Sequence, residues 1–123
     1  MKKTVAIIGA SQDESKYGNK AIKAYIHQGW RVIPVNPNEK KIEGLKTYHS
    51  ILDIRKNIDR VSLYVPPSIG INIIEDIAEK GAKEVFFNPG TESKELVLKA
   101  KKLGIDPILA CSILDINESP ESY

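Results

Sequence analysis

Five short apolar segments alternate with longer amphipathic segments along the chain, and this alternation restricts the fold more than any other feature. The apolar segments begin at about residues 4, 31, 60, 84 and 106. Three of the amphipathic segments end in Gly29, Gly81 or Gly104, and a new apolar segment begins within a few residues. Because glycine is preferred just after a helix, this order predicts helices that are each followed by a strand.

The repeated strand–helix unit predicts an α/β fold in which a parallel sheet carries helices on both faces. We expect a Rossmann-like three-layer sandwich with a five-stranded parallel sheet in the order 3-2-1-4-5. The first strand, residues 4–9, is apolar without alternation, as in strands that are buried on both faces. Weaker patterns predict a short helix over residues 49–57 and a helix N-cap at Ser68.

Length and composition indicate one soluble domain. The chain has 123 residues, so we assign residues 1–123 to a single domain with a polar tail that frays from about residue 117. Eighteen basic and sixteen acidic residues give a net charge of +2, which does not favour nucleic-acid binding. No segment approaches the roughly 18 apolar residues of a membrane span, and the first apolar run is too short for a signal peptide. We therefore expect a cytoplasmic protein with no membrane contact.

The turns that follow the strands define the expected ligand site. In open α/β sheets, ligands bind beyond the carboxyl ends of the strands. These turns contain glycine and proline but few acids, bases or nucleophiles, so they predict a binding cleft with no catalytic residue and no metal site. The turns consist of Gly9, Ala10 and Ser11; Val35, Asn36 and Pro37; Val65, Pro66 and Pro67; and Asn88, Pro89 and Gly90.

The loop after the first strand is the strongest local signal for a ligand. Gly9 permits a tight turn and a close approach of the ligand to the backbone. Backbone N–H groups after Gly9, and those at the helix start near Gly18 and Asn19, can face an anion. Lys16 and Lys20 can add positive charge. The alternative is that Gly9 only ends a strand and that both lysines are solvated.

The spacing of the glycines argues against a dinucleotide. A dinucleotide turn follows the pattern G-x-G-x-x-G, with an acidic residue after the second strand. Here Gly18 lies nine positions after Gly9, and the second strand ends in Val35, Asn36 and Pro37. The chain also lacks the P-loop pattern of ATP-hydrolysing proteins. These absences disfavour an NAD(P)-dependent nucleotide-binding enzyme or regulator. We keep it as an alternative, together with an interaction module that has lost its ligand.

Five motifs follow one another between about Thr4 and Cys111: VAIIGAS, KYGNKAI, GWRVIPVNP, YVPPS and NPGTES. In this order and spacing they resemble the small CoA-binding proteins. The same fold forms the N-terminal CoA-binding domain of succinyl-CoA synthetase α subunits and of acyl-CoA synthetases. The resemblance implies a Rossmann-like fold that holds coenzyme A along the strand ends.

The resemblance also assigns parts of the ligand to individual turns. The first loop would face the CoA phosphates, the second turn the nucleotide end, the third the adenine or the pantetheine arm, and the fourth the far side. The implied contacts are Gly9, Ala10, Ser11, Lys16, Tyr17, Gly18, Asn19, Val35, Asn36, Pro37, Val65, Pro66, Pro67, Asn88, Pro89 and Gly90.

These observations predict a stand-alone protein that binds CoA or acyl-CoA as a sensor or carrier and has no evident catalytic residues. The larger synthetases need a phosphorylatable histidine, whereas His27 and His49 are expected at a helix end and in a linking loop. Cys111 is either a small buried residue or a thiol that exchanges disulfides with the CoA sulfhydryl. The sequence leaves open the acyl group, a protein partner and a homo-oligomer.

Overall fold

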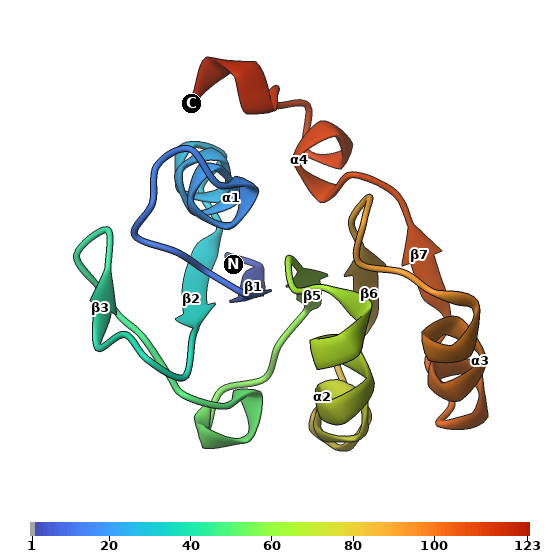
Figure 1. The fold of residues 1–123 in the computed structure, drawn as a ribbon. Coiled ribbons are helices and arrows are strands. Elements are labelled where there is room, and N and C mark those ends of the chain that lie inside the picture. The colour runs from blue at the N-terminus through green and yellow to red at the C-terminus, as the bar shows by residue number, and fades with distance from the viewer. Residues whose placement is uncertain (1) are drawn as a thin grey trace.

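The computed structural model describes residues 2–123 and contains a five-stranded parallel sheet between two layers of helices (Figure 1). The strands of this sheet are β1 (Thr4–Ile8), β2 (Arg31–Val35), β5 (Arg60–Leu63), β6 (Glu84–Phe87) and β7 (Pro107–Leu109). The helices are α1 (Tyr17–His27), α2 (Pro67–Lys80), α3 (Lys94–Lys102) and α4 (Ser112–Asp115), with 3₁₀ turns η1 (Ile51–Asp53) and η2 (Pro120–Ser122). The predicted α/β fold class and all five predicted strands are confirmed. None of the helices within the described range has the length and apolar character needed to cross a membrane.

The strand order is β2-β1-β5-β6-β7, which corrects the expected order. Numbered along the chain as five strands, this is 2-1-3-4-5 and not 3-2-1-4-5. Pro34 explains the edge position of β2, because its carbonyl oxygen faces outward to the N–H of Tyr48 at 3.0 Å. The N–H that proline lacks is therefore missing on the outer edge, where sheets tolerate proline. All four residues of β5 are buried, as befits a central strand. The sheet thus diverges between β1 and β5, which makes this position the topological switch point.

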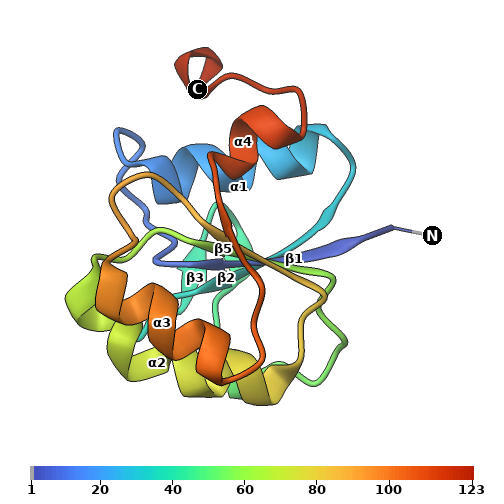
Figure 2. The ribbon, with the colours of Figure 1, turned by 90° about the vertical axis from the view of Figure 1, so that its right-hand side faces the viewer.

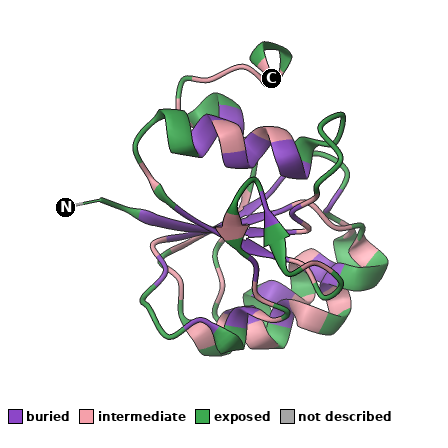
Figure 3. Cartoon of the chain, turned by 90° about the vertical axis from the view of Figure 1, so that its left-hand side faces the viewer, coloured by how far each residue is buried: buried purple, intermediate pink, exposed green. Residues whose placement is uncertain are grey.

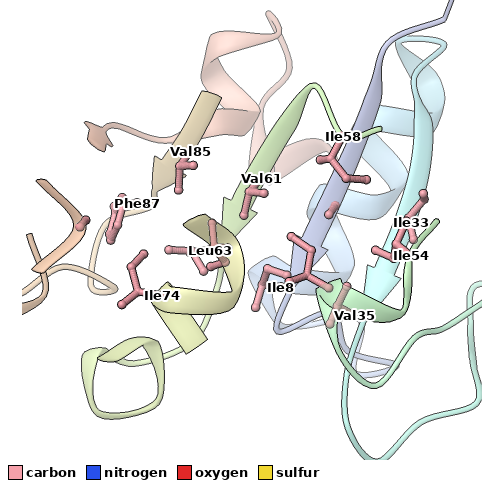
Figure 4. Close-up of a cluster of buried hydrophobic side chains, with 14 of the residues drawn as sticks. Ile8, Ile33, Val35, Ile54, Ile58, Val61, Leu63, Ile74, Val85 and Phe87 are labelled. Atoms are coloured by element: carbon pink, nitrogen blue, oxygen red, sulfur yellow. The ribbon is translucent and has the colours of Figure 1, made fainter. Parts of the chain in front are cut away.

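The two faces of the sheet carry different helices. In Figure 2, α1 and α4 lie on one face of the sheet, while α2 and α3 lie on the other. Since alternate residues of a strand point to opposite faces, Val5 and Ile7 of β1 join the α1 core and Ala6 and Ile8 join the α2 core. Figure 3 shows that burial is concentrated in the strands and the inward sides of the helices. In the α2 core, Ile74 lies beside the strand residues (Figure 4). The first strand is therefore buried on both faces, as its sequence predicted.

The sequence predicted some of the helix ends correctly and one of them wrongly. The three glycines that follow helices adopt positive φ angles, as predicted. The prediction that Ser68 caps α2 is wrong, because the helix begins at Pro67 with Pro66 as its N-cap. Proline suits the first helical position because its φ is already helical and it lacks an N–H there. The helix predicted over residues 49–57 is reduced to η1, which Ser50 caps.

Two short segments outside the main sheet differ from the sequence prediction. The sequence patterns indicated no strand in residues 38–47, but these residues contain the antiparallel strands β3 (Lys41–Ile42) and β4 (Leu45–Lys46). The C-terminal segment was expected to fray, but it packs against α1. Lys20 Nζ donates to the Tyr123 carbonyl at 2.7 Å, and the Tyr123 hydroxyl donates to Glu118 at 2.6 Å. The polar residues of this segment thus form hydrogen bonds that hold it in place.

Candidate functional site

A groove of about 540 Å³, here called the central groove, opens where the carboxyl ends of β1 and β5 meet. Its walls come from the loop after β1, the first turn of α1 and the turns after β5 and β6. Most of the residues that the sequence predicted lie together in it, namely Gly9, Ala10, Ser11, Lys16, Tyr17, Gly18, Asn36, Val65, Pro66, Pro89 and Gly90. The groove therefore occupies the switch point of the sheet, where ligands bind in this class of fold.

Five predicted residues do not line the central groove. Val35 and Pro37 line an adjoining cavity, and Pro67 begins α2. Asn19 and Asn88 are buried, and their side-chain NH₂ groups donate hydrogen bonds inside the protein, whereas Asn19 Oδ1 has no partner in the described chain. These two asparagines thus shape the walls of the site from behind.

The sequence prediction missed Ser15, Tyr64 and Thr91, which complete the lining of the groove. Tyr64 directly precedes the Val65 turn, and Thr91 directly follows Gly90. Extending each predicted turn by one residue would have found both. Ser15 gives no comparable signal, because its position depends on how the long loop before α1 folds.

Gly9 and Gly18 allow three segments of backbone to pack closely beneath the groove. A Cβ atom on Gly9 would lie 2.7 Å from the Tyr64 carbonyl oxygen, and the φ of Gly9 is +85°. A Cβ atom on Gly18 would lie 2.3 Å from the carbonyl oxygen of Gly9. Neither position has room for a side chain, so glycine is required at both. Gly18 therefore lets the start of α1 pack directly on the turn at Gly9. This contact explains the nine-residue spacing of the two glycines, which does not fit a dinucleotide motif.

Backbone N–H groups without an acceptor in residues 2–123 occur at Ser11, Val65 and Gly90 of the groove as well as at the start of α1. The N–H groups of Gly9 and Ala10 both donate to the Val35 carbonyl, at 3.1 and 3.3 Å, so two of the amides near the first turn are already engaged. The N–H groups of Tyr17 and Gly18 have no acceptor within residues 2–123. Helix N-termini bind anions through such groups and through the positive end of the helix dipole. The start of α1 therefore presents donors that suit an anion.

Of the charged side chains considered near the start of α1, Lys16 is the one that faces the groove without a partner in the described chain. Hydrogen bonds from Ser15 lower the pKa of Asp13, and a hydrogen bond from Lys23 lowers the pKa of Glu14, so both acids are ionised and paired. Lys20, which the sequence suggested for the ligand, donates instead to the Tyr123 carbonyl. Lys16 lines the groove and is exposed. Its ammonium group is the basic side chain available to a bound anion.

A buried network of neutral polar groups supports the far wall of the groove. The Asn88 amide donates to Ser62 Oγ at 2.9 Å and to the Leu63 carbonyl at 2.8 Å, and its oxygen accepts the Ser112 N–H at 2.8 Å. The Tyr64 hydroxyl lies 3.2 Å from Ser112 Oγ. Burial raises the pKa of Tyr64 to about 12. Tyr64 therefore stays protonated at neutral pH and does not act as a base.

A second cavity of about 400 Å³, here called the α2 cavity, adjoins the groove between the end of β2 and α2. Val35, Pro37 and Ile73 contribute apolar surface, and His49 and Asp76 add polar side chains. Three residues line both the groove and this cavity, so the two spaces meet at a common wall. The shared residues are Gly9, Asn36 and Val65.

The fold and the groove together define a Rossmann-like domain with an open groove at the strand ends and unpaired amide donors at the start of α1. Residues 3–117 match the CoA binding domain family, and the chain belongs to this family. The resemblance inferred from the sequence motifs is thereby confirmed.

Curated relatives include ADP-forming acetate–CoA ligases. The chain is 35% identical over 112 residues to the α subunit of acetate–CoA ligase II from Pyrococcus furiosus, covering 82% of this chain and 24% of that subunit. It is 36% identical over 115 residues to acetate–CoA ligase II from Archaeoglobus fulgidus, covering 84% of this chain and 17% of that enzyme. The chain thus spans a quarter or less of the length of these relatives.

Solved structures of similar size share the fold along nearly their whole length. A conserved hypothetical protein from Pyrococcus furiosus superposes with a TM-score of 0.84 at 35% identity, covering 94% of this chain and 99% of that one. A Thermus thermophilus protein superposes with a TM-score of 0.86 at 26% identity, covering 94% and 89%. The fold described here therefore also occurs in chains of about this size.

Proposed function

We propose that this protein binds coenzyme A or acyl-CoA in the central groove and serves as a carrier or sensor, without itself catalysing a reaction. The observation that carries the proposal is the free helix start of α1 at the switch point, in a chain of the CoA-binding domain family. A phosphorylated ligand would meet the Tyr17 and Gly18 amides and the Lys16 ammonium group. Amide donors, a helix dipole and a cation together suit a pyrophosphate.

The shape and lining of the neighbouring spaces fit the remaining parts of CoA. The α2 cavity offers apolar surface from Val35 and Pro37 beside polar side chains, which suits a flat base with hydrogen-bonding edges. The turn at Val65 and Pro66 and the turn at Pro89 border the groove with uncharged surface, which suits the pantetheine arm. In this proposal the ligand therefore extends along the strand ends from the α2 cavity.

The chemistry of the groove supports binding in preference to catalysis. Apart from its two tyrosines, Lys16 is the one ionisable side chain among the lining residues. Tyr64 is held protonated by burial, and Tyr17 is largely exposed. General acid–base catalysis needs a group that changes protonation near the working pH. A groove with this lining is suited to holding a ligand.

A panel of thermal melts tests the proposal. Purified protein is heated with CoA, acetyl-CoA, NAD, NADP and ATP, each in large excess. A ligand at 100 times its dissociation constant stabilises a protein by about 2.7 kcal/mol, which raises the Tm of a domain of this size by about 10 °C. We expect this shift with CoA and acetyl-CoA and little shift with NAD. A shift with NAD alone would favour a nucleotide-dependent enzyme, and a flat panel would favour an interaction module.

A further inference from the structure

A third cavity, here called the Cys111 cavity, adjoins the other end of the central groove. It has a volume of about 280 Å³ and lies between the start of α1, the turn after β6 and the segment that follows β7. Tyr17, Tyr64 and Pro89 line both this cavity and the groove. It shares no lining residue with the α2 cavity. The groove is therefore bordered by two separate cavities, one at each end.

The Asn88 and Tyr64 side chains of the Cys111 cavity already have partners within the protein, whereas the Tyr17 hydroxyl and the Cys111 thiol have none in residues 2–123. Both N–H bonds of the Asn88 amide are donated to groups of β5, and its oxygen accepts the Ser112 N–H. The Tyr64 hydroxyl pairs with Ser112 Oγ. Leu114 and Pro120 add apolar surface. A polar heterocycle would find few free hydrogen-bonding partners here, whereas an alkyl group would find apolar walls.

The α2 cavity is also mainly apolar, but it differs in its polar side chains. Asn38, His49 and Asp76 line it together with aliphatic side chains. These side chains can satisfy the ring nitrogens and amino group of a base, whereas the lining of the Cys111 cavity offers the Tyr17 hydroxyl and the weakly hydrogen-bonding Cys111 thiol. The contrast orients the ligand, because it assigns the nucleotide end to the α2 cavity and the acyl end to the Cys111 cavity.

The C-terminal segment forms part of the wall of the Cys111 cavity. Leu114 lies on α4 and keeps 60% of its surface exposed, and Tyr17 keeps 59% exposed. A bound apolar group would cover part of both side chains and gain free energy by removing them from water. Pro120 begins η2 and lies beyond residues 3–117, which match the family. Pro120 is therefore a part of the cavity wall that lies outside the region matched to the family.

We infer that the Cys111 cavity is a subsite for the acyl group of a short-chain acyl-CoA, and that the protein binds such thioesters more tightly than CoA without an acyl group. The inference rests on the proposed binding of CoA in the central groove. Full burial of one methylene group tightens binding about fourfold. The dissociation constant should therefore fall about fourfold from acetyl-CoA to propionyl-CoA and again to butyryl-CoA.

Isothermal titration calorimetry on the full chain tests this series. The ligands are desulfo-CoA, acetyl-CoA, propionyl-CoA and butyryl-CoA. The inference requires affinity to rise along the series, with desulfo-CoA the weakest. Equal affinities for all four ligands would overturn the acyl subsite but leave the proposed CoA site intact. Failure of every ligand to bind would instead overturn the proposed function itself.

A pair of leucine variants locates the effect. Leu114→Trp places a larger side chain at the Cys111 cavity, and Leu98→Trp makes the same change on α3 at a leucine that is 51% exposed. Leu114→Trp should abolish the gain of butyryl-CoA over desulfo-CoA and leave desulfo-CoA binding unchanged. Leu98→Trp should preserve the gain. An unchanged preference in Leu114→Trp would contradict the assignment.

Alkylation of Cys111 gives a readout that needs no substitution. Cys111 is the one cysteine of the sequence, and its side chain is half-buried at the cavity. Saturating butyryl-CoA should slow its reaction with iodoacetamide severalfold more than saturating desulfo-CoA, which has no thiol to consume the reagent. Equal protection by the two ligands would place the acyl group elsewhere and overturn the inference.

Discussion

The cluster around Arg60 and the central groove are both rich in polar groups, but these groups are paired in the cluster and partly unpaired in the groove. Arg60 is 5% exposed, and its guanidinium group donates to Glu84, Asp115 and the Tyr25 hydroxyl. Two aromatic rings lie over it, with centroids 4.3 and 5.0 Å from the guanidinium carbon. Every part of this charge is therefore covered or paired.

The groove, by contrast, leaves donors unpaired where the backbone bends. The Tyr17 and Gly18 N–H groups have no acceptor in the described chain, and Lys16 is exposed beside them. Unsatisfied donors are tolerated there because water reaches them. The difference teaches that the paired cluster holds the sheet and its helices together, whereas the open donors are available to a ligand. Changes at the two regions should therefore separate stability from binding.

Arg60→Ala should cause one of the two largest losses of stability. Removing the guanidinium group leaves its carboxylate partners unpaired and opens a gap between two aromatic rings. We expect the free energy of unfolding to fall by about 3 kcal/mol, at the lower end for buried ion pairs because Glu84 and Asp115 are partly exposed. Urea denaturation measures the loss. Arg31→Ala, at an exposed arginine, should change stability by less than about 0.5 kcal/mol. A fall in CoA affinity of the folded Arg60→Ala protein would contradict the conclusion that the Arg60 cluster serves stability and not binding.

Two alanine substitutions, one at the groove and one away from it, measure how tightly the backbone of the groove is packed. Gly9 and Gly29 have nearly the same φ, +85° and +83°, but no atom lies within 4 Å of a Cβ built on Gly29. Gly29→Ala should lose about 1 kcal/mol from backbone strain alone. Gly9→Ala should lose about 2 kcal/mol more, because its Cβ meets the Tyr64 carbonyl. Thermal or urea unfolding of both variants gives the difference, and equal losses would show that the backbone at the groove relaxes freely.

The double variant Ser11→Ala with Lys16→Ala should separate binding from folding. It removes a hydroxyl and a positive charge from the groove, so CoA should bind about tenfold more weakly. The free energy of unfolding should change by less than about 1 kcal/mol, because Lys16 is exposed and half-buried Ser11 gives up one exposed hydrogen bond, from the Asp13 N–H. Calorimetry and urea denaturation give the two numbers. The matched control pairs Ser122→Ala with Lys102→Ala, at exposed sites away from the groove. Equal losses of binding in the two double variants would show that the loop is not part of the site.

The smallest expected effect is a pH dependence of the C-terminal segment. Hydrogen bonds from Tyr123, Gln28 and His27 lower the pKa of Glu118 from 4.5 to about 2. A lowered carboxylate pKa stabilises the folded state above pH 4.5, and this contribution is lost as the pH falls from about 4.5 to 2. The NMR resonances of the Tyr123 ring should shift over that range as the segment detaches. Glu118→Gln should remove the transition, and its persistence in that variant would assign it to another group.

Local sequence signals determined the number and kind of elements. The apolar runs at residues 4–9 and 84–90 and the glycines that follow the helices need only a few neighbouring residues to act, so they can be recognised without the fold. The motifs also predicted most of the groove, because turns such as Val65–Pro66 follow directly from strands whose ends share one edge. In this part of the molecule, knowing the strands was enough to place the site.

Tertiary structure decided what depends on residues far apart in the chain. The place of β2 at the edge follows from which way Pro34 faces, and that direction exists only once the strand is paired with β1. Glycine is needed at position 18 because the Gly9 carbonyl packs against it across the turn. Whether a backbone amide of the groove is paired depends on distant acceptors such as the Val35 carbonyl. Hydrogen bonds and close packing between distant segments form only when the chain is folded. Short-range patterns therefore specify the elements, whereas long-range contacts specify which donors are left open for a ligand.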